Sequence, residues 1–299
     1  MIAASWLWVA FTLLAAAGQT VRNAMQRELV ATLGTGGATH VRFLFGFPFA
    51  LIFLAAVIIA TGRALPQPGL MFWPWVLDGA LAQVAATALM LAAMNDRSFV
   101  VTIAYIKTEP VQAALFGLIF LGDALTLPMV VAILVATGGV VAMALKGGGA
   151  ARGGLKPTLL GLAAGAMFAL SATGYRGAIL SLEHPNFVLA ATFTVTVGLV
   201  LQAVLLTLYL TFKDRAVLAA IARAWRPSLF AGFMGATASE FWFLAFALAS
   251  VANVRTLALV EVLFAQAISF FIFKQATARR EALGMALIVA GVVLLIWVQ

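Results

Sequence analysis

Ser98–Asp123 reads SFVVTIAYIKTEPVQAALFGLIFLGD, an apolar segment with two charged residues, Lys107 and Glu109, near its middle. The segment is long enough to cross a bilayer as a helix, which takes about 20 residues. A charged side chain at that depth costs roughly 2.5 kcal/mol or more unless it faces a cavity or a partner. We therefore expect these polar residues to face the interior of a helical membrane protein.

The polar residues of this segment follow a helical spacing. Positions i, i+3, i+4 and i+7, which share one helical face, carry Tyr105, Thr108, Glu109 and Gln112. Lys107 stands two residues before Glu109, so it points to another face and is expected to pair with a different helix. Pro110 removes a backbone donor beside the glutamate. We expect the helix to bend or loosen there and to act as a gating hinge.

A related segment lies in the second half of the chain. Ser250–Gln275 reads SVANVRTLALVEVLFAQAISFFIFKQ, and its Glu261 follows Glu109 by 261 − 109 = 152 residues. At the same offset Gly139 meets Gly291. Paired mid-segment glutamates indicate two homologous halves, an arrangement common in membrane transporters.

Composition places the chain among membrane proteins. Of its 299 residues, 64% are hydrophobic and 9% are charged, against about 25% charged in soluble domains. The chain has no cysteine, which excludes disulfides and thiolate metal sites, and two histidines are too few for a histidine metal cluster. We expect neither a metal nor a cofactor. The net charge of +8 lies mainly between apolar segments, so it predicts orientation in the membrane rather than nucleic-acid binding.

The predicted fold is an all-α polytopic membrane protein with ten transmembrane helices. The predicted spans are 4–26, 37–60, 71–94, 98–121, 126–145, 158–181, 186–211, 228–248, 252–273 and 280–298. The predicted division is a first repeat at 1–146, a Gly-rich linker at 147–157 and a second repeat at 158–299. Since each half has five helices, the second half enters the membrane upside down relative to the first, giving two inverted five-helix repeats.

Loop charges predict the orientation. One side of the predicted membrane protein carries most of the basic loop residues, among them Arg97, Lys146, Arg152, Lys156, Lys213, Arg215 and Arg223. Positively charged loops stay in the cytoplasm, so both termini are expected to lie outside. The expected location is a multi-pass position in a bacterial inner (plasma) membrane.

Polar residues inside the predicted helices are the candidates for a substrate site. The candidates for the substrate and cavity set are Glu109, Glu261, Tyr105, Lys107, Gln112, Gln19, Arg22, Asn23, Gln83, Tyr175, Glu240 and Trp242. Structural roles stay open beside the functional ones. The glutamates could form ion pairs, and Arg22 could extend to the membrane interface. Arg42 and Arg255 are expected to be interfacial or paired.

The sequence resembles a known family of carriers. Glu109-Pro110-Val111 followed by Phe120-Leu121-Gly122-Asp123, in a chain of two five-helix repeats, resembles the EamA-type permeases of the drug/metabolite transporter superfamily. The second repeat departs from this pattern, because Val262 replaces the proline and Lys274-Gln275 replaces the Gly-acid pair. The resemblance implies a carrier with a central cavity that works by alternating access. It also implies cytoplasmic termini, opposite to the orientation that the loop charges predict.

The expected function is therefore secondary transport of small organic solutes, amino-acid-like metabolites or drugs, in the export direction. The glutamates could hold an ammonium group, while Lys107, Arg22 and Arg176 could hold a carboxylate. A carboxyl group buried in a low-dielectric cavity can exchange protons near neutral pH, so protons are a candidate coupling ion. The other partners are the lipid bilayer and a small-molecule substrate, and the chain is a monomer or a homodimer.

Two alternatives remain open at this point. One is a carrier for sugar-phosphate or nucleotide-type anions, because relatives in the same superfamily carry such solutes. The other is a polytopic membrane enzyme or a lipid-handling protein. The sequence has no GxSxG, HExxH or cysteine–histidine motif, so we expect no enzymatic activity.

Overall fold

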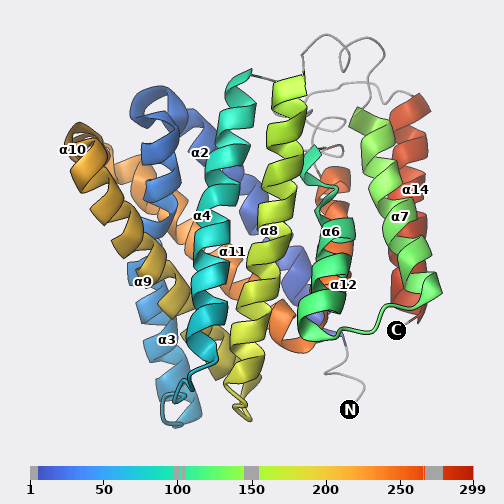
Figure 1. Ribbon diagram of the computed structural model, residues 1–299, viewed down its shortest axis with the longest axis horizontal. Coiled ribbons are helices and arrows are strands. Elements are labelled where there is room, and N and C mark those ends of the chain that lie inside the picture. Colours follow the sequence, from blue (N-terminus) through green and yellow to red (C-terminus); the bar gives the residue numbers. More distant parts are fainter. Residues whose placement is uncertain are drawn as a thin grey trace.

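The computed structural model describes residues 6–96, 102, 105–144, 155–264, 266 and 279–298, and every regular element within them is helical. The all-α prediction is thus confirmed (Figure 1). The elements are α2 (Leu7–Leu44), α3 (Phe47–Thr61), α4 (Phe72–Asp96), α6 (Glu109–Phe116), η1 (Gly117–Leu121), α7 (Leu127–Ala144), α8 (Leu155–Ser181), α9 (Phe187–Lys213), α10 (Arg215–Arg223), α11 (Trp225–Leu248), α12 (Val251–Leu257), η3 (Ala258–Val260) and α14 (Arg279–Val298).

Several of these helices suit a membrane. In the described chain, the stretches long and apolar enough to cross one are Leu7–Thr61, Phe72–Met94, Thr158–Ser181, Phe187–Lys213, Trp225–Leu248 and Arg279–Val298. Large apolar side chains also cover the outer surface, and in α3 only Ala50 is buried. An outer surface of this kind is stable in lipid but would promote aggregation in water. These features fit an integral membrane protein.

α2 consists of two helices joined at Gly34. This glycine has φ 66° and ψ 176°, a conformation that side chains with a Cβ rarely adopt. In Figure 1 the chain rises through the dark blue part of α2, reverses at the upper end and descends to α3. The first predicted helix therefore continues seven residues beyond residue 26, up to the turn. The predicted end of this span at residue 26 therefore falls inside the bundle, where Arg22, Asn23 and Gln26 are buried.

The two segments with central glutamates are both interrupted just before the glutamate. Lys107 and Thr108 form a turn that precedes α6, and the 3-10 turn η3 separates α12 from Glu261. Pro110 lies in the first turn of α6, where a helix has no internal bond to lose. The proline thus begins a new helix, whereas the sequence analysis expected it to bend a continuous one.

The boundaries of α4, α7, α8, α9, α11 and α14 lie within three residues of predicted spans, whereas the predicted span 37–60 is divided between α2 and α3 and α10 falls in no predicted span. Residues 155–157 belong to α8 instead of the linker, and 147–154 lie outside the described residues. Residues 98–101 and most of 265–278 also lie outside them, so the structure describes only part of the fourth and ninth predicted spans.

Small residues allow the helices to approach closely. α4 packs along α8, α11 along α2 and α14 along α7 (Figure 1). A Cβ added at Gly139 of α7 would lie 2.6 Å from the Gly284 carbonyl oxygen of α14, and one added at Gly291 would lie 2.6 Å from the Ala136 backbone nitrogen. Backbones in such contact gain dispersion energy, which holds helices together in lipid.

We expect Gly139→Ala to lower the thermal stability of the purified protein, because the new methyl group would collide with the backbone of α14. The matched control is Gly138→Ala, since nothing lies within 4 Å of a Cβ at that exposed neighbour. Helix propensity alone favours alanine over glycine at both positions, by about 1 kcal/mol. Thermal unfolding in detergent measures the difference, and equal stability of the two variants would contradict close packing at Gly139.

Candidate functional site: a charged cavity between the helices

Two adjoining cavities lie inside the helical bundle. The first is lined by Gln19, Arg22, Asn23, Met90, Ile106, Lys107, Glu109, Phe168, Arg255 and Glu261. The second is lined by Gln19, Arg42, Gln83, Phe168, Ser171, Ala172, Tyr175, Ser239, Trp242, Phe243, Phe246 and Arg255. Because Gln19, Phe168 and Arg255 line both, the two cavities form one site with a charged part and an aromatic part.

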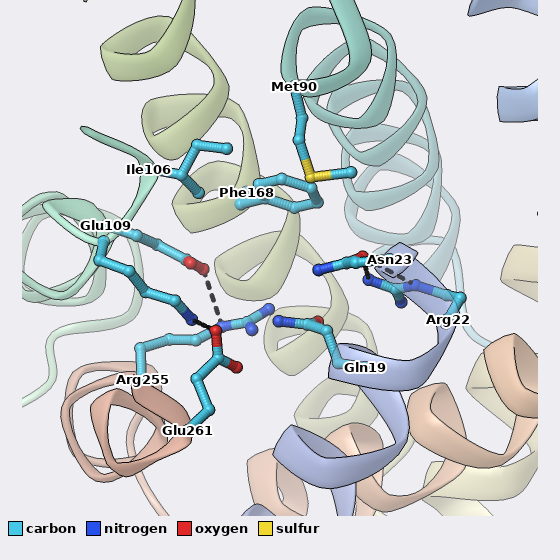
Figure 2. A pocket seen from close by; sticks show the side chains of 10 residues that line it. Gln19, Arg22, Asn23, Met90, Ile106, Glu109, Phe168, Arg255 and Glu261 are labelled. Atoms are coloured by element: carbon cyan, nitrogen blue, oxygen red, sulfur yellow. Dashed lines mark hydrogen bonds and ion pairs between the residues drawn. The ribbon is translucent and has the colours of Figure 1, made fainter. Parts of the chain in front are cut away.

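Two ion pairs cross the first cavity. The Lys107 Nζ lies 2.5 Å from Glu261 Oε1, and the Arg255 Nε lies 2.8 Å from Glu109 Oε1. Figure 2 shows Glu109, Arg255 and Glu261 converging on the cavity from two different segments. Each glutamate is thus neutralised by a cation of the other interrupted segment. All four side chains are less than a tenth exposed, so loss of one partner would leave a buried charge uncompensated.

Arg255 also connects the charged part to the aromatic part. Its guanidinium carbon lies 4.3 Å from the centre of the Trp242 ring and 5.2 Å from that of Phe246. The Trp242 indole N–H donates to Gln19 Oε1 at 3.1 Å. A guanidinium in contact with a ring face is attracted by the ring's negative face, more strongly where water is absent. These contacts fix the orientation of Arg255 toward Glu109.

Two further arginines line the cavities, and neither forms an ion pair within the described part of the chain. Arg22 is 1% exposed, and its Nη2 and Nε donate to Asn23 Oδ1 at 2.8 and 3.3 Å. Arg42 is 2% exposed, and its Nη1 donates to Thr87 Oγ1 at 3.1 Å. Arg22 Nη1 and Arg42 Nε are buried without a hydrogen-bond partner. The site therefore carries a positive charge that its own carboxylates do not balance.

The aromatic part is packed around Tyr175. This ring lies against Phe243 with 4.5 Å between ring centres, and glycines at 79 and 198 leave room for it. In the same part of the bundle, the Gln202 Nε2 group donates a hydrogen bond to Gln83 Oε1 at 2.9 Å, and Gln83 lines the second cavity with Tyr175. Such a surface can hold an apolar group while a few polar atoms fix its orientation.

Most of the predicted candidates line this site. Those that do are Glu109, Glu261, Lys107, Gln19, Arg22, Asn23, Gln83, Tyr175 and Trp242. Lys107 pairs with a different segment, as its spacing predicted. Glu261 follows Lys107 by 154 residues (261 − 107 = 154). A pairing over this distance is a property of the tertiary structure, and helical spacing does not specify it.

Three candidates lie elsewhere. Tyr105 precedes the interruption at residues 107 and 108, so it is not on a continuous helix with Glu109, and neither Tyr105 nor Gln112 lines either cavity. They lie instead against Gly161 and Gly165 of α8. Glu240 accepts a hydrogen bond from Thr192 of α9 and lines neither cavity.

Arg42 and Arg255 were predicted to be interfacial or paired and were not among the substrate-site candidates, but both line the site, where Arg255 is indeed paired, with Glu109. Arg42 lies in the last turn of α2, after the turn at Gly34, and is buried in the bundle. Arg255 precedes Glu261 by six residues across an interruption that no proline marks. Arg176, a candidate for binding a carboxylate, contacts Asp123 at 3.5 Å and lines neither cavity.

Comparison with known proteins reveals the fold and no function. No family model matches the chain. No curated protein matches it. Among 27 matching chains of solved structures, one crystal structure of a protein superposes with a TM-score of 0.70 over 99% of each chain. Its sequence is 18% identical, so the likeness shows a shared fold over the whole length of both chains.

We expect Lys107→Met to destabilise the purified protein strongly, by roughly 3–5 kcal/mol, because Glu261 would keep a buried charge without its partner. The double variant Lys107→Met with Glu261→Met should recover most of this loss, since an apolar pair fits a buried site. Thermal or denaturant unfolding of the single and double variants forms a double-mutant cycle. Additive losses in that cycle would mean that the two residues do not act as a pair.

Proposed function

We propose that the protein is a secondary transporter for small organic solutes, built as an EamA-type permease of the drug/metabolite transporter superfamily, and that it works by alternating access. The observation that carries this proposal is the site itself: a charged and aromatic cavity inside the helical bundle, between two interrupted segments. Ionisable residues inside a membrane bundle mark solute or ion pathways. Interrupted helices at a central site are typical of transporters.

The contact between α7 and α14 supports two related halves. Gly139 of α7 faces Gly284 and Ile288 of α14, whereas Gly291 of α14 faces Ala132 and Ala136 of α7. The differences 291 − 139, 284 − 132 and 288 − 136 all equal 152. Each contact that α7 makes with α14 is therefore matched by a contact between the equivalent residues in the opposite direction, as in an interface with two-fold symmetry. On this basis we assign 1–146 and 158–299 to two inverted five-helix repeats.

The interruptions support the same assignment. At the offset of 152 residues, the turn at Lys107 and Thr108 corresponds to 259 and 260, which lie within η3. Both repeats thus lose regular helix immediately before the central glutamate, although only the first has a proline there. A backbone interrupted at equivalent depth in both halves can bend on either side of the cavity.

Alternating access requires contacts that differ between two states. In the structure, the ion pairs Lys107–Glu261 and Arg255–Glu109 hold the two interrupted segments together. A substrate that competes for one of these charges would weaken the cross-link, so that one half could move against the other. Proton uptake by either glutamate would have the same effect, which makes protons the candidate coupling ion.

Transport by purified protein in liposomes tests the proposal. We expect saturable counterflow of at least one of labelled phenylalanine, benzoate and phenylethylamine, with a rate lowered at least tenfold by Glu109→Gln, because Arg255 would lose its partner. The matched control is Glu28→Gln, whose glutamate is exposed on α2. An imposed pH gradient should increase accumulation by the wild type and not by Glu109→Gln or Glu261→Gln.

Two outcomes would contradict these expectations separately. Absence of counterflow for all three solutes, in liposomes that contain folded protein, would remove the carrier proposal for such solutes. Equal accumulation with and without the pH gradient would remove proton coupling and leave a uniporter.

The distribution of basic residues leads us to propose that both termini face the outside. The first residues of α2 and the last residues of α14 lie at the same end of the bundle (Figure 1). A reporter that is active only outside the cytoplasm should therefore be active when fused after Gln299 and silent when inserted between Lys213 and Arg223. The reverse result would restore the cytoplasmic termini that the resemblance to EamA-type permeases implies.

A further inference from the structure

We propose that the central site selects an organic anion, with the acid group held by Arg22 and Arg42 and an apolar body held by Phe168, Trp242 and Phe243. This inference rests on the proposed function, because it names the class of solute that the carrier would move. It narrows the range of amino-acid-like and other small solutes to those with a net negative charge.

The balance of charge in the cavity walls is the first argument. Four cationic side chains line the two cavities, namely Arg22, Arg42, Lys107 and Arg255, against two carboxylates, those of Glu109 and Glu261. Both carboxylates are occupied by ion pairs with Lys107 and Arg255. The guanidinium groups of Arg22 and Arg42 therefore have no ion-pair partner among the described residues, a condition that costs free energy and that a bound anion relieves.

Free donors are the second argument. Arg22 Nη1 and Arg42 Nε are buried and have no hydrogen-bond partner. A guanidinium group presents its N–H donors in a planar fork that matches a carboxylate or a phosphate. An acid group in the cavity would satisfy donors that the protein leaves open.

The two arginines are also close to each other. A Cβ at Gly235 of α11 would lie 3.5 Å from Arg22 Cδ and 3.4 Å from Arg42 Cγ. Both side-chain stems thus lie against the same part of α11. Among the described residues, neither Arg22 nor Arg42 has an acidic partner. Two adjacent guanidinium groups of this kind can bind one anion together.

Zwitterions and cations fit this form of the site less well. An ammonium group needs a carboxylate, and both carboxylates in the cavity walls already contact a cation at 2.8 Å or less. Glu240 lies against Thr192 and lines neither cavity. An ammonium group would have to share Glu109 or Glu261 with the cation that already pairs with it, whereas an acid group at Arg22 and Arg42 would meet no such competitor among the described residues.

The aromatic part suits the rest of the solute. Phe168 lies in the walls of both cavities, and Trp242 and Phe243 line the second beside Arg42 and Arg255. An acid group at the arginines would therefore place its apolar substituent against rings. Carboxylate and phosphate share the chemistry that the arginines recognise, so the experiment separates them.

The test uses four probes of similar size on the purified full-length protein: benzoate, phenyl phosphate, benzamide and benzylamine. We expect benzoate or phenyl phosphate to raise the unfolding temperature in a concentration-dependent way. We expect an affinity at least about tenfold above those of benzamide and benzylamine, because charge-assisted hydrogen bonds are the stronger kind. The ratio of benzoate to phenyl phosphate affinity identifies the acid group. Equal or stronger binding of benzamide or benzylamine, or no binding of either anion, would overturn the proposal.

Variants locate the binding. Arg22→Gln and Arg42→Gln should each weaken anion binding by about tenfold or more, and Arg223→Gln, which removes an exposed arginine of α10, should leave it unchanged. Unchanged affinity in both cavity variants would overturn the assignment of the acid group. Should either variant fail to fold, the probe series on the wild-type protein still decides the charge preference. Anion binding without counterflow would contradict the transport function alone, whereas counterflow of phenylalanine or phenylethylamine without anion preference would contradict this inference alone.

Discussion

Charge buried in an apolar bundle is the constraint on which the rest of this structure depends. The lining of the central site includes Lys107, Glu109, Arg255 and Glu261, all less than a tenth exposed. The free-energy cost of removing such groups from water is several kcal/mol each and is recovered only by close pairing. The pairing links Glu109 to Arg255 and Glu261 to Lys107, so the two glutamate segments are held to each other before any substrate is considered.

Backbone geometry makes this pairing possible. A continuous helix would place Lys107 and Glu109 on different faces, and it would carry one of them away from the cavity. The turn before α6 allows both residues to line the same cavity. In the other segment η3 occupies the equivalent place before Glu261. Helix interruption and ion pairing therefore depend on each other. Bending of the backbone at either interruption would change the Lys107–Glu261 and Arg255–Glu109 contacts.

The two remaining arginines of the site meet at α11. The side-chain stems of Arg22 and Arg42 lie against the same part of that helix, at Gly235, and the turn at Gly34 reverses the chain before Arg42 enters the interior. The result is a cavity whose cations outnumber its carboxylates, bordered by Trp242 and neighbouring rings. A solute of the opposite charge with an apolar body complements both features, and this complementarity connects the architecture to the substrate class that we propose.

The amino-acid sequence alone determined the helical class, most helix ranges and the principal charged residues of the cavity. Apolar segments of about 20 residues can satisfy their backbone in lipid only as helices, and charges such as Lys107, Glu109 and Glu261 stand out within them because burial makes them rare. Only the tertiary structure decided which charge pairs with which, because the partners lie about 150 residues apart and on helices whose rotation the apolar pattern leaves open. It also decided that Arg42 and Arg255 belong to the site and that Tyr105, Gln112 and Glu240 do not. The placements of Arg42, Arg255 and Tyr105 follow from the turn at Gly34 and from the breaks before Glu109 and Glu261, whereas Gln112 and Glu240 contact α8 and α9. A local break shifts every later residue to a different face, and hydrophobic periodicity carries no record of such a shift.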